Sequence, residues 1–341
     1  MRLSLYTDHR VGRPAADDVR DRRRPFVDPG PVESIRPDHP TDETDPEKTE
    51  HERAARDQTI EWPIRRYHRS GRQTALQDRV VREQRVELLL NGVPLLAMLA
   101  LPRDVEALAL GFLVSEGLWR DCQRLPEVCF DPSAGRVDCT GPFDEDAAES
   151  IHRRWTFGTG CGGGGTARDP SVLAECRPLA SRVTVPAARL AARGREFSRQ
   201  GALYRLTGGV HACGIADADR VLLFAEDVGR HNAFDKVAGM ALLARMDLSN
   251  KIALTTGRLS AEIVGKAVAH GVPLLASSSA PTAMGVQWAR RFGMTLVGFL
   301  RGGRMNVYTG YQRVTGDSEP GAAEVGGEPP TAGGRSPEAG A

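Results

Sequence analysis

The sequence is short of several features that define common classes of protein. None of its six cysteines is paired in the C-x-x-C spacing of a structural zinc site or a dithiol redox motif. No apolar run approaches the roughly 18 residues of a membrane span, and the first ten residues lack the apolar core of a signal peptide. The formal net charge of +1 provides no net basic field to attract nucleic acid. We therefore predict a cytoplasmic protein with no structural metal, no membrane contact and no nucleic-acid partner.

Apolar residues are also scarce at both ends of the chain. Residues 1–72 are dense in Arg, Asp, Glu, His and Pro, and residues 315–341 are rich in Gly, Pro, Ala and Glu. Such compositions cannot bury enough apolar surface to offset the conformational entropy lost on folding, so both ends are predicted to be disordered tails. A chain that starts near Thr74 is expected to fold and function. About 240 residues remain for one large or two small domains.

Regular structure is predicted to begin near Val80. The Asn91-Gly92 dipeptide tolerates the positive φ of a hairpin turn and separates two apolar strands. A helix that ends before Gly117 and a second strand pair follow. Residues 73–155 are therefore assigned to a small α+β domain. Its strands are expected at 82–90, 93–100, 127–130 and 136–140, and its helices at 102–116 and 144–154.

A single cysteine, Cys161, stands among five glycines in the string T-G-C-G-G-G-G-T at residues 159–166. Consecutive glycines cannot pack a core or hold a helix, because glycine has no side chain to bury and the largest backbone entropy to lose. Residues 156–185 are therefore predicted to be a mobile loop and linker. Composition alone supports a flexible linker and a reactive-thiol loop equally. A phosphate-binding loop is disfavoured, because no lysine follows Gly165.

Strands and helices alternate in the second half of the chain, which we assign to a ligand-binding α/β domain at residues 186–314. Strands separated by helices of this length predict a mostly parallel sheet with helices on both faces. The strands are expected at 221–225, 251–255, 273–277 and 295–299, and the helices at 186–200, 231–245, 260–270 and 281–292.

Every predicted strand of this domain ends in a polar cluster. In open α/β sheets the ligand crevice lies outside the carboxyl ends of the strands. One interpretation is that the arginines there pair with nearby carboxylates on a solvated surface. Their occurrence at several strand ends favours the other, a site for a large anionic ligand. The arginines are Arg230, Arg258, Arg301 and Arg304, and the carboxylates are Glu226, Asp227 and Glu262.

Three further residues have side chains that can act as ligands, bases or nucleophiles, and each also has a structural interpretation. His211 and His231 are candidate ligands or bases, although a lone histidine is more often a hydrogen-bonded structural residue. Cys213 stands in an apolar context and is predicted to be a buried small hydrophobe.

Several strings together resemble the formate dehydrogenase accessory sulfurtransferase family. The resemblance runs from about Val80 to Thr309, in the family's order, and covers the part predicted to fold. The strings include G-F-L-V-S-E-G at 111–117, T-G-G-V-H-A at 207–212, E-D-V-G-R-H-N at 226–232 and G-F-L-R-G-G-R-M-N-V-Y at 298–308. The resemblance implies a larger domain similar in fold to cytidine deaminases. The H-x-E and P-C-x-x-C strings of a zinc deaminase are absent near His211 and Cys161.

The resemblance also implies a function as a sulfur carrier. A cysteine desulfurase would load Cys161 as a persulfide. The sulfur would then pass to the molybdenum (or tungsten) bis(molybdopterin guanine dinucleotide) cofactor before its insertion into the formate dehydrogenase apoenzyme. The family's cofactor-binding segment, which would take up the guanine nucleotide moiety, corresponds to Phe299, Leu300, Arg301, Gly302, Gly303 and Arg304. A homodimer is also implied.

One position departs from the family. Its loop commonly holds two cysteines spaced C-x-x-C, whereas the second position here is Gly164. A two-cysteine relay is therefore in doubt, but a single-cysteine carrier remains chemically complete. The alternative is a chaperone that binds the molybdenum cofactor without transferring sulfur.

Overall fold

The computed structural model describes residues 46–143 and 178–316. The chain divides into two units, Met1–Thr44 and Asp45–Ala341, and all described residues belong to the second. The predicted helix at 144–154, Cys161 with its glycines, and most of both predicted tails lie outside the described residues.

Residues 46–72 are folded, which corrects the prediction of a disordered tail for this part. Helix α1 (Pro46–Asp57) precedes strand β1 (Thr59–Tyr67), which pairs antiparallel with β2 (Gln73–Val81). Ala55 of α1 is buried in an apolar cluster that contains Leu203. Composition gave the wrong prediction of disorder because most side chains of β1 are exposed. An exposed ribbon has the same polar composition as an unfolded segment.

Within the predicted small α+β unit, residues 84–140 form one sheet and one helix, whereas residues 73–81 pair with β1. Its sheet has the order β4-β3-β6-β5, and α2 (Val105–Ser115) covers it with an apolar core that includes Leu88 and Leu108. Asn91 and Gly92 have φ values of 49° and 78°, as the predicted hairpin turn requires. The strands are β3 (Gln84–Leu90), β4 (Val93–Ala100), β5 (Glu127–Asp131) and β6 (Arg136–Thr140).

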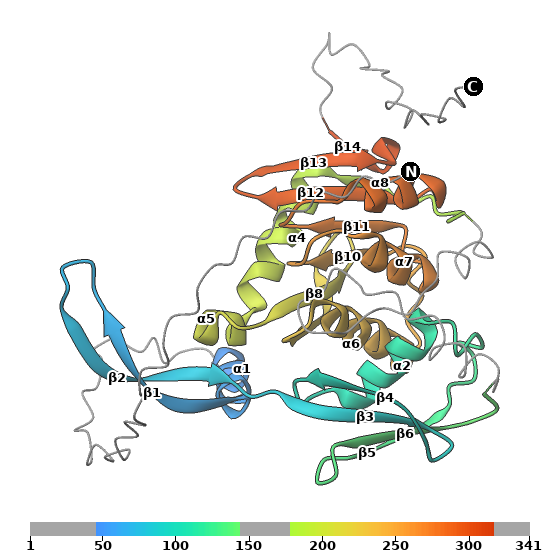
Figure 1. The fold of residues 1–341 in the computed structure, drawn as a ribbon. Helices are drawn as coiled ribbons and strands as arrows, with labels where there is room; N and C mark the ends of the chain where they lie inside the picture. Colours follow the sequence, from blue (N-terminus) through green and yellow to red (C-terminus); the bar gives the residue numbers. More distant parts are fainter. Residues whose placement is uncertain (1–45, 144–177, 317–341) are drawn as a thin grey trace, which may run out of the picture. The chain divides into compact units, whose positions relative to one another are not determined.

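The second half of the chain builds a six-stranded sheet with the order β13-β12-β11-β10-β8-β9 (Figure 1). Its strands are β8 (His211–Ala216), β9 (Val221–Asp227), β10 (Ile252–Thr255), β11 (Leu274–Ser277), β12 (Thr295–Arg301) and β13 (Arg304–Thr309). The helices are α4 (Ala187–Gln200), α5 (Ala202–Thr207), α6 (Arg230–Leu243), α7 (Ala261–Ala269) and α8 (Ala283–Arg291). Short β7 (Val185–Pro186) pairs with β14 (Val314–Thr315), which follows the 3-10 helix η2 (Tyr311–Arg313).

The prediction of a mostly parallel sheet is wrong. Within this six-stranded sheet the β10–β11 and β11–β12 pairs are parallel, whereas β12 pairs antiparallel with β13 and β8 pairs antiparallel with both β9 and β10. The error arose because β8 was not recognised as a strand and lies between two strands that follow it in the chain. Since β9 is two antiparallel steps from β10, the two run in the same direction. The carboxyl ends of β9, β10, β11 and β12 therefore still lie along one edge.

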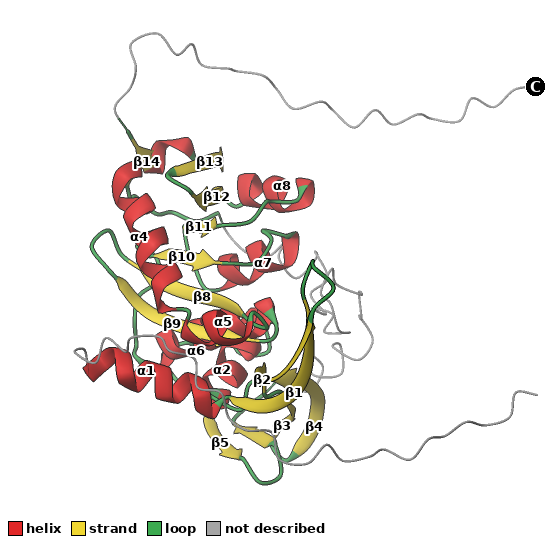
Figure 2. Ribbon diagram, turned by 90° about the vertical axis from the view of Figure 1, so that its left-hand side faces the viewer, coloured by secondary structure: helices red, strands yellow, loops and turns green. Residues whose placement is uncertain are grey.

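Helices cover both faces of this sheet (Figure 2). Alternate residues of β10 point to opposite faces. Ala253 packs in the core shared with α6, α7 and α8, and Leu254 packs in the core shared with α4. The edge at the carboxyl ends is thus bordered by α4 on one face and by the start of α6 on the other.

Helix α2 packs closely along α6 and joins the small unit to the large sheet. A Cβ at Gly111 would lie 1.9 Å from the carbonyl oxygen of Asp235, and one at Gly239 would lie 1.8 Å from that of Ala107. Only glycine permits this reciprocal approach of the two backbones.

Candidate functional site

The edge at the carboxyl ends brings together residues that are far apart in the sequence. His211 begins β8 opposite Asp227, the last residue of β9. Thr256 follows β10, Ser278 follows β11 and Arg301 ends β12. The predicted convergence of polar strand ends on one rim is confirmed.

The predicted cofactor-binding segment, residues 299–304, comprises the end of β12, the tight turn at Gly302 and Gly303, and the first residue of β13. Gly302 and Gly303 have φ values of 59° and 76°, and the flanking Arg301 and Arg304 pair across the turn. Two consecutive positive φ values are typical of a type I′ hairpin turn, which presents the two flanking side chains next to each other. Arg304 therefore begins a strand rather than continuing a loop.

Two residues before this turn fix its position. Leu300 is buried, and its side chain would lie 2.9 Å from a Cβ on Gly194 of α4. Phe299 has an unusual φ of 54°, and its ring centroid lies 5.7 Å from the guanidinium carbon of Arg301. The turn is thus anchored on α4 by Leu300, while both arginines remain exposed.

The turn and α4 enclose a cationic cavity of about 300 Å³. Its four arginines are all exposed, and none has an ion-pair partner among the described residues. No described Asp or Glu lines it. An anion entering this cavity would meet guanidinium groups that are not already neutralised. The lining includes Arg195, Ser198 and Arg199 of α4, Ser278, Arg301 and Arg304.

The sequence analysis missed the arginines of α4. Arg195 and Arg199 are four residues apart and therefore share one face of the helix. Nothing in the sequence says which face of α4 meets the strand ends. The structure shows which face it is, because Gly194 of α4 lies against the side chain of Leu300.

A second cavity of about 520 Å³ adjoins the first, and Ser198 and Ser278 line both. His211 lies in its wall, with Nδ1 3.3 Å from the hydroxyl oxygen of Thr256. The pKa of His211 is lowered by burial and by nearby cationic groups, including Arg230. A neutral imidazole therefore borders this cavity and can both donate and accept hydrogen bonds.

Arg230 does not belong to the exposed site. It is only 7% exposed and lies with one guanidinium nitrogen 3.5 Å from the carboxylate of Glu262. His231 approaches the same carboxylate at 3.0 Å, and burial lowers its pKa. Arg230 therefore approaches a carboxylate, as the alternative interpretation predicts, but in the interior and not on a solvated surface. Arg258 is exposed at the rim but does not line the cationic cavity.

The carboxylates at the end of β9 also have structural roles. Asp227 is fully buried, 2.7 Å from the ammonium of Lys236. Glu226 accepts hydrogen bonds from the backbone N–H groups of Leu203 and Tyr204 at the start of α5. Neither side chain neutralises the arginines of the cationic cavity.

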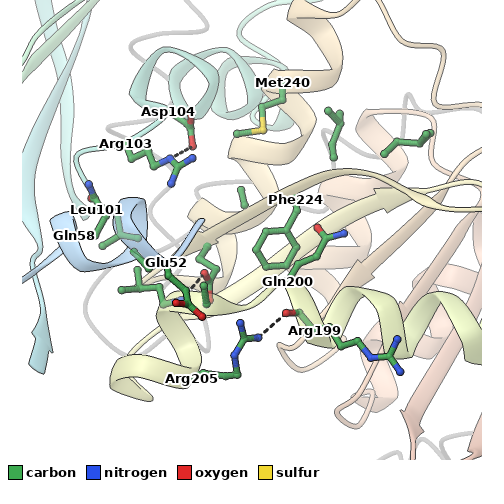
Figure 3. A pocket seen from close by; sticks show the side chains of 17 residues that line it. Glu52, Gln58, Leu101, Arg103, Asp104, Arg199, Gln200, Arg205, Phe224 and Met240 are labelled. Carbon is green, nitrogen blue, oxygen red and sulfur yellow. Dashed lines mark hydrogen bonds and ion pairs between the residues drawn. The ribbon is translucent and has the colours of Figure 1, made fainter. Parts of the chain in front are cut away.

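A third cavity, of about 530 Å³, lies on the other side of Arg199, toward α1 and α5 (Figure 3). Its charged groups are largely engaged with one another. Arg103 pairs with Asp104, and Arg205 donates to the backbone oxygen of Arg199. This cavity differs from the cationic cavity in that Glu52, Asp104 and Glu226 line it together with its arginines.

Cys139 and Cys213 are buried, whereas Cys122 and Cys129 are exposed. Cys213 is 1% exposed, and burial raises its pKa to about 12, which confirms its predicted role as a small hydrophobe. Across residues 46–143 and 178–316 there is no group of three or more His, Cys, Asp or Glu residues suited to a metal ion. The helices within these ranges include none that is long and apolar enough to cross a membrane.

Comparison with known proteins places the chain in a family. The model of the FdhD/NarQ family matches residues 81–315. The chain is 36% identical over 239 residues to a sulfur carrier protein FdhD from Wolinella succinogenes, covering 70% of this chain and 83% of the relative. It is 37% identical over 266 residues to one from Xanthomonas axonopodis pv. citri, covering 77% and 94%.

A solved structure agrees with this assignment. It is described as a formate dehydrogenase accessory protein from Desulfotalea psychrophila and is 28% identical, with a TM-score of 0.63. The match covers 75% of this chain and 99% of the other. The chain belongs to the FdhD/NarQ family.

Proposed function

We propose that this protein is a sulfur carrier in the maturation of formate dehydrogenase. It takes sulfur from a cysteine desulfurase as a persulfide on Cys161. It then transfers that sulfur to the bis(molybdopterin guanine dinucleotide) cofactor before the cofactor enters the apoenzyme. Its relatives are named sulfur carrier proteins, which supports the general role. The persulfide and the cofactor are the finer parts of the proposal.

The cationic cavity is the observation that carries the cofactor part. A dinucleotide cofactor has phosphate groups, and guanidinium groups hold phosphate oxygens with paired, charge-assisted hydrogen bonds. Arg301 and Arg304 come from the segment assigned to the cofactor by family resemblance, and Arg195 and Arg199 reinforce it from α4. The adjoining cavity, with His211 and Thr256, offers neutral hydrogen-bonding groups for a heterocyclic ring.

The sulfur step needs one thiolate at the carrier. The thiolate of Cys161 attacks the outer sulfur of the donor's persulfide. The S–S bond of the donor breaks, the outer sulfur remains on Cys161, and the donor cysteine leaves as a thiolate. No net oxidation occurs in this exchange, so a second loop cysteine at position 164 is not required.

Intact mass spectrometry tests the persulfide. After incubation with a cysteine desulfurase and cysteine, the wild-type chain should gain about 32 Da, the mass of one sulfur atom, and the gain should disappear on reduction. Cys161→Ser should not gain it, whereas Cys129→Ser should. An adduct that persists in Cys161→Ser would contradict the assignment of the carrier cysteine.

Calorimetry with guanosine diphosphate tests the cavity. Arg301→Ala or Arg304→Ala should weaken binding by roughly 1.5–3 kcal/mol, the usual range for a hydrogen bond to a charged group. Arg290→Ala on α8, exposed and outside the cavity, is the matched control. Unchanged affinity in the Arg301→Ala/Arg304→Ala double variant would move the site elsewhere.

The second candidate function is a cofactor-binding chaperone without sulfur transfer. The cationic cavity alone would suit that role, because it requires no thiol. The two functions differ in the effect of Cys161→Ser on the maturation of formate dehydrogenase. Maturation should be lost if the chain carries sulfur and retained if it only escorts the cofactor.

A further inference from the structure

The ribbon of β1 and β2 is amphipathic, and three apolar side chains on one of its faces are exposed, whereas Ile64 and Leu76 on that face are partly buried. The register places Ile60, Trp62 and Ile64 of β1 on the same face as Leu76, Asp78 and Val80 of β2, with Asp78 opposite Trp62. Trp62 is 56% exposed, Val80 is 38% exposed and Ile60 is 36% exposed. An isolated two-stranded ribbon is at best marginally stable in water, so an apolar face of this kind gains stability from a partner.

The base of the ribbon is fixed while the rest extends from it. Thr59 is buried, and its hydroxyl donates to the backbone oxygen of Arg56 and accepts from Arg79. The Arg82 N–H donates to the backbone oxygen of Gln58. Beyond this base the side chains of both strands are mostly exposed. This geometry holds an extended arm in place at one end.

The ribbon is strongly basic. Residues 59–82 contain six arginines and only two acidic residues, Glu61 and Asp78, a net charge of +4 in a chain whose total is +1. Both acidic residues are paired with arginines of the ribbon itself. From Arg65 to Arg72 there is no acidic residue. A second copy of the same ribbon would repel this tip, whereas an acidic protein surface would attract it.

The position of the ribbon separates it from the cofactor site. Its base contacts α1 and α5, and α5 is held by Glu226 of β9, which is one edge strand of the six-stranded sheet. The arginine turn lies between β12 and β13, at the opposite edge. A protein that receives the cofactor has to cover the turn, but a sulfur donor does not.

We propose that the β1–β2 ribbon is the docking surface for the sulfur donor, the cysteine desulfurase. The ribbon binds an acidic face of the desulfurase that has an apolar patch beside it. The apolar face supplies contact area, and the basic tip steers the encounter. This assignment rests on the proposed function. Because the complex has to dissociate after each transfer, an arm whose attraction is largely electrostatic suits a short-lived contact.

The test compares two ribbon variants with one charge-matched control. Arg65→Glu/Arg69→Glu reverses two exposed arginines at the tip, and Trp62→Ser removes the largest apolar contact without changing charge. Arg182→Glu/Arg290→Glu makes the same change in charge at two exposed positions outside the ribbon. Circular dichroism and guanosine diphosphate affinity should be unchanged in all three.

Binding to the purified cysteine desulfurase is measured by calorimetry at two salt concentrations, separately from sulfur loading. Each ribbon variant should bind at least about tenfold more weakly than the control, and the charge-reversal variant should lose most of the salt dependence. Loading of Cys161 from the desulfurase should slow in proportion, while loading from inorganic polysulfide should not change.

The proposal is overturned if the ribbon variants and the control variant bind the donor with equal affinity, or if the control variant also loses donor affinity. It is also overturned if the ribbon variants bind the donor normally but change the oligomeric state. The same holds if they bind the donor normally but fail to bind the formate dehydrogenase apoenzyme. Normal binding of the wild type to the desulfurase without any sulfur adduct would instead contradict the proposed sulfur transfer and leave the docking surface supported.

Discussion

Charged residues of this chain fall into two groups that look alike in the sequence. Lys266 is fully buried, with its ammonium 2.8 Å from Asp235 and 3.0 Å from Glu116, and it lies over the ring of Phe112. Arg301, in contrast, is exposed and has no carboxylate partner among the described residues. Buried charges that are paired maintain the fold, whereas exposed and unpaired ones are available to a ligand.

Replacing Lys266 by Met should be strongly destabilising. It would leave two carboxylates buried without their counter-charge, which typically costs about 3–5 kcal/mol. The free energy of unfolding in urea measures this. Lys251→Met, at a partly exposed position, is the control and should stay within about 0.5 kcal/mol of the wild type.

The contribution of Lys266 to the free energy of unfolding should also depend on pH. Burial alone would lower the pKa of Lys266, but Asp235 and Glu116 outweigh it and raise the pKa above 10.5. The stabilisation is therefore fully present below the unfolded-state pKa and lost as the pH rises through the higher folded-state value. Lys266→Met should lack this alkaline loss. An alkaline profile identical to the wild type would contradict the role of the buried pair.

Thiol reactivity should follow burial. Burial raises the pKa of both Cys139 and Cys213 to about 12, so these thiols should resist iodoacetamide at pH 8 in the native protein. Exposed Cys129 should be alkylated first among the cysteines of the described residues. Peptide mass spectrometry before and after denaturation checks this order. Rapid native labelling of Cys213 would show that the α6 core opens.

Elements with strong local signals were predicted well. The hairpin at Asn91-Gly92 and the βα alternation after Val221 were recognised because turn residues and apolar periodicity mark them. Strand β8 was missed because both of its faces are buried, which removes the alternation of polar and apolar residues. Strand order is set by contacts between distant segments, so the antiparallel position of β8 was beyond the reach of local patterns.

The α2–α6 crossing should depend on its two glycines. Gly111→Ala or Gly239→Ala would place a methyl group against the facing backbone, and separating the two helices should cost roughly 1–3 kcal/mol or more. Gly194→Ala is the control, because its methyl group would meet only the movable side chain of Leu300. Thermal unfolding of the three variants should rank Gly194→Ala as the mildest. Equal effects would show that the crossing adjusts.

At the scale of the molecule, the site could be predicted only in part. The rim of strand ends could be predicted because strand ends are local features, and the segment 299–304 was assigned by resemblance to the family. That Arg301 and Arg195 line the same cavity could not be predicted, because it depends on how α4 lies across the sheet. The folded state of residues 46–72 was missed for a related reason, because few of their side chains contact the core.

A chain beginning at Thr74 should therefore be less stable than expected from composition. It would lose α1 and the pairing partner of β2, and it would expose the apolar surface around Leu203 and Val210. The free energy of unfolding should fall by roughly 1–3 kcal/mol, because this much apolar surface would no longer be buried. Urea unfolding of chains starting at Asp45 and at Thr74 measures the difference. Equal stabilities would show that the N-terminal elements do not support the fold.

The contacts around α2 and α6 have a consequence for the integrity of the polypeptide. Leu99, Leu101 and Glu116 precede residue 144, yet they bond to Asn232, Asp227, Lys236 and Lys266, which follow residue 177. The covalent connection between the two segments is therefore not what holds them together. Residues 46–143 and 178–316, produced as separate polypeptides in one cell, should assemble and copurify as a split protein.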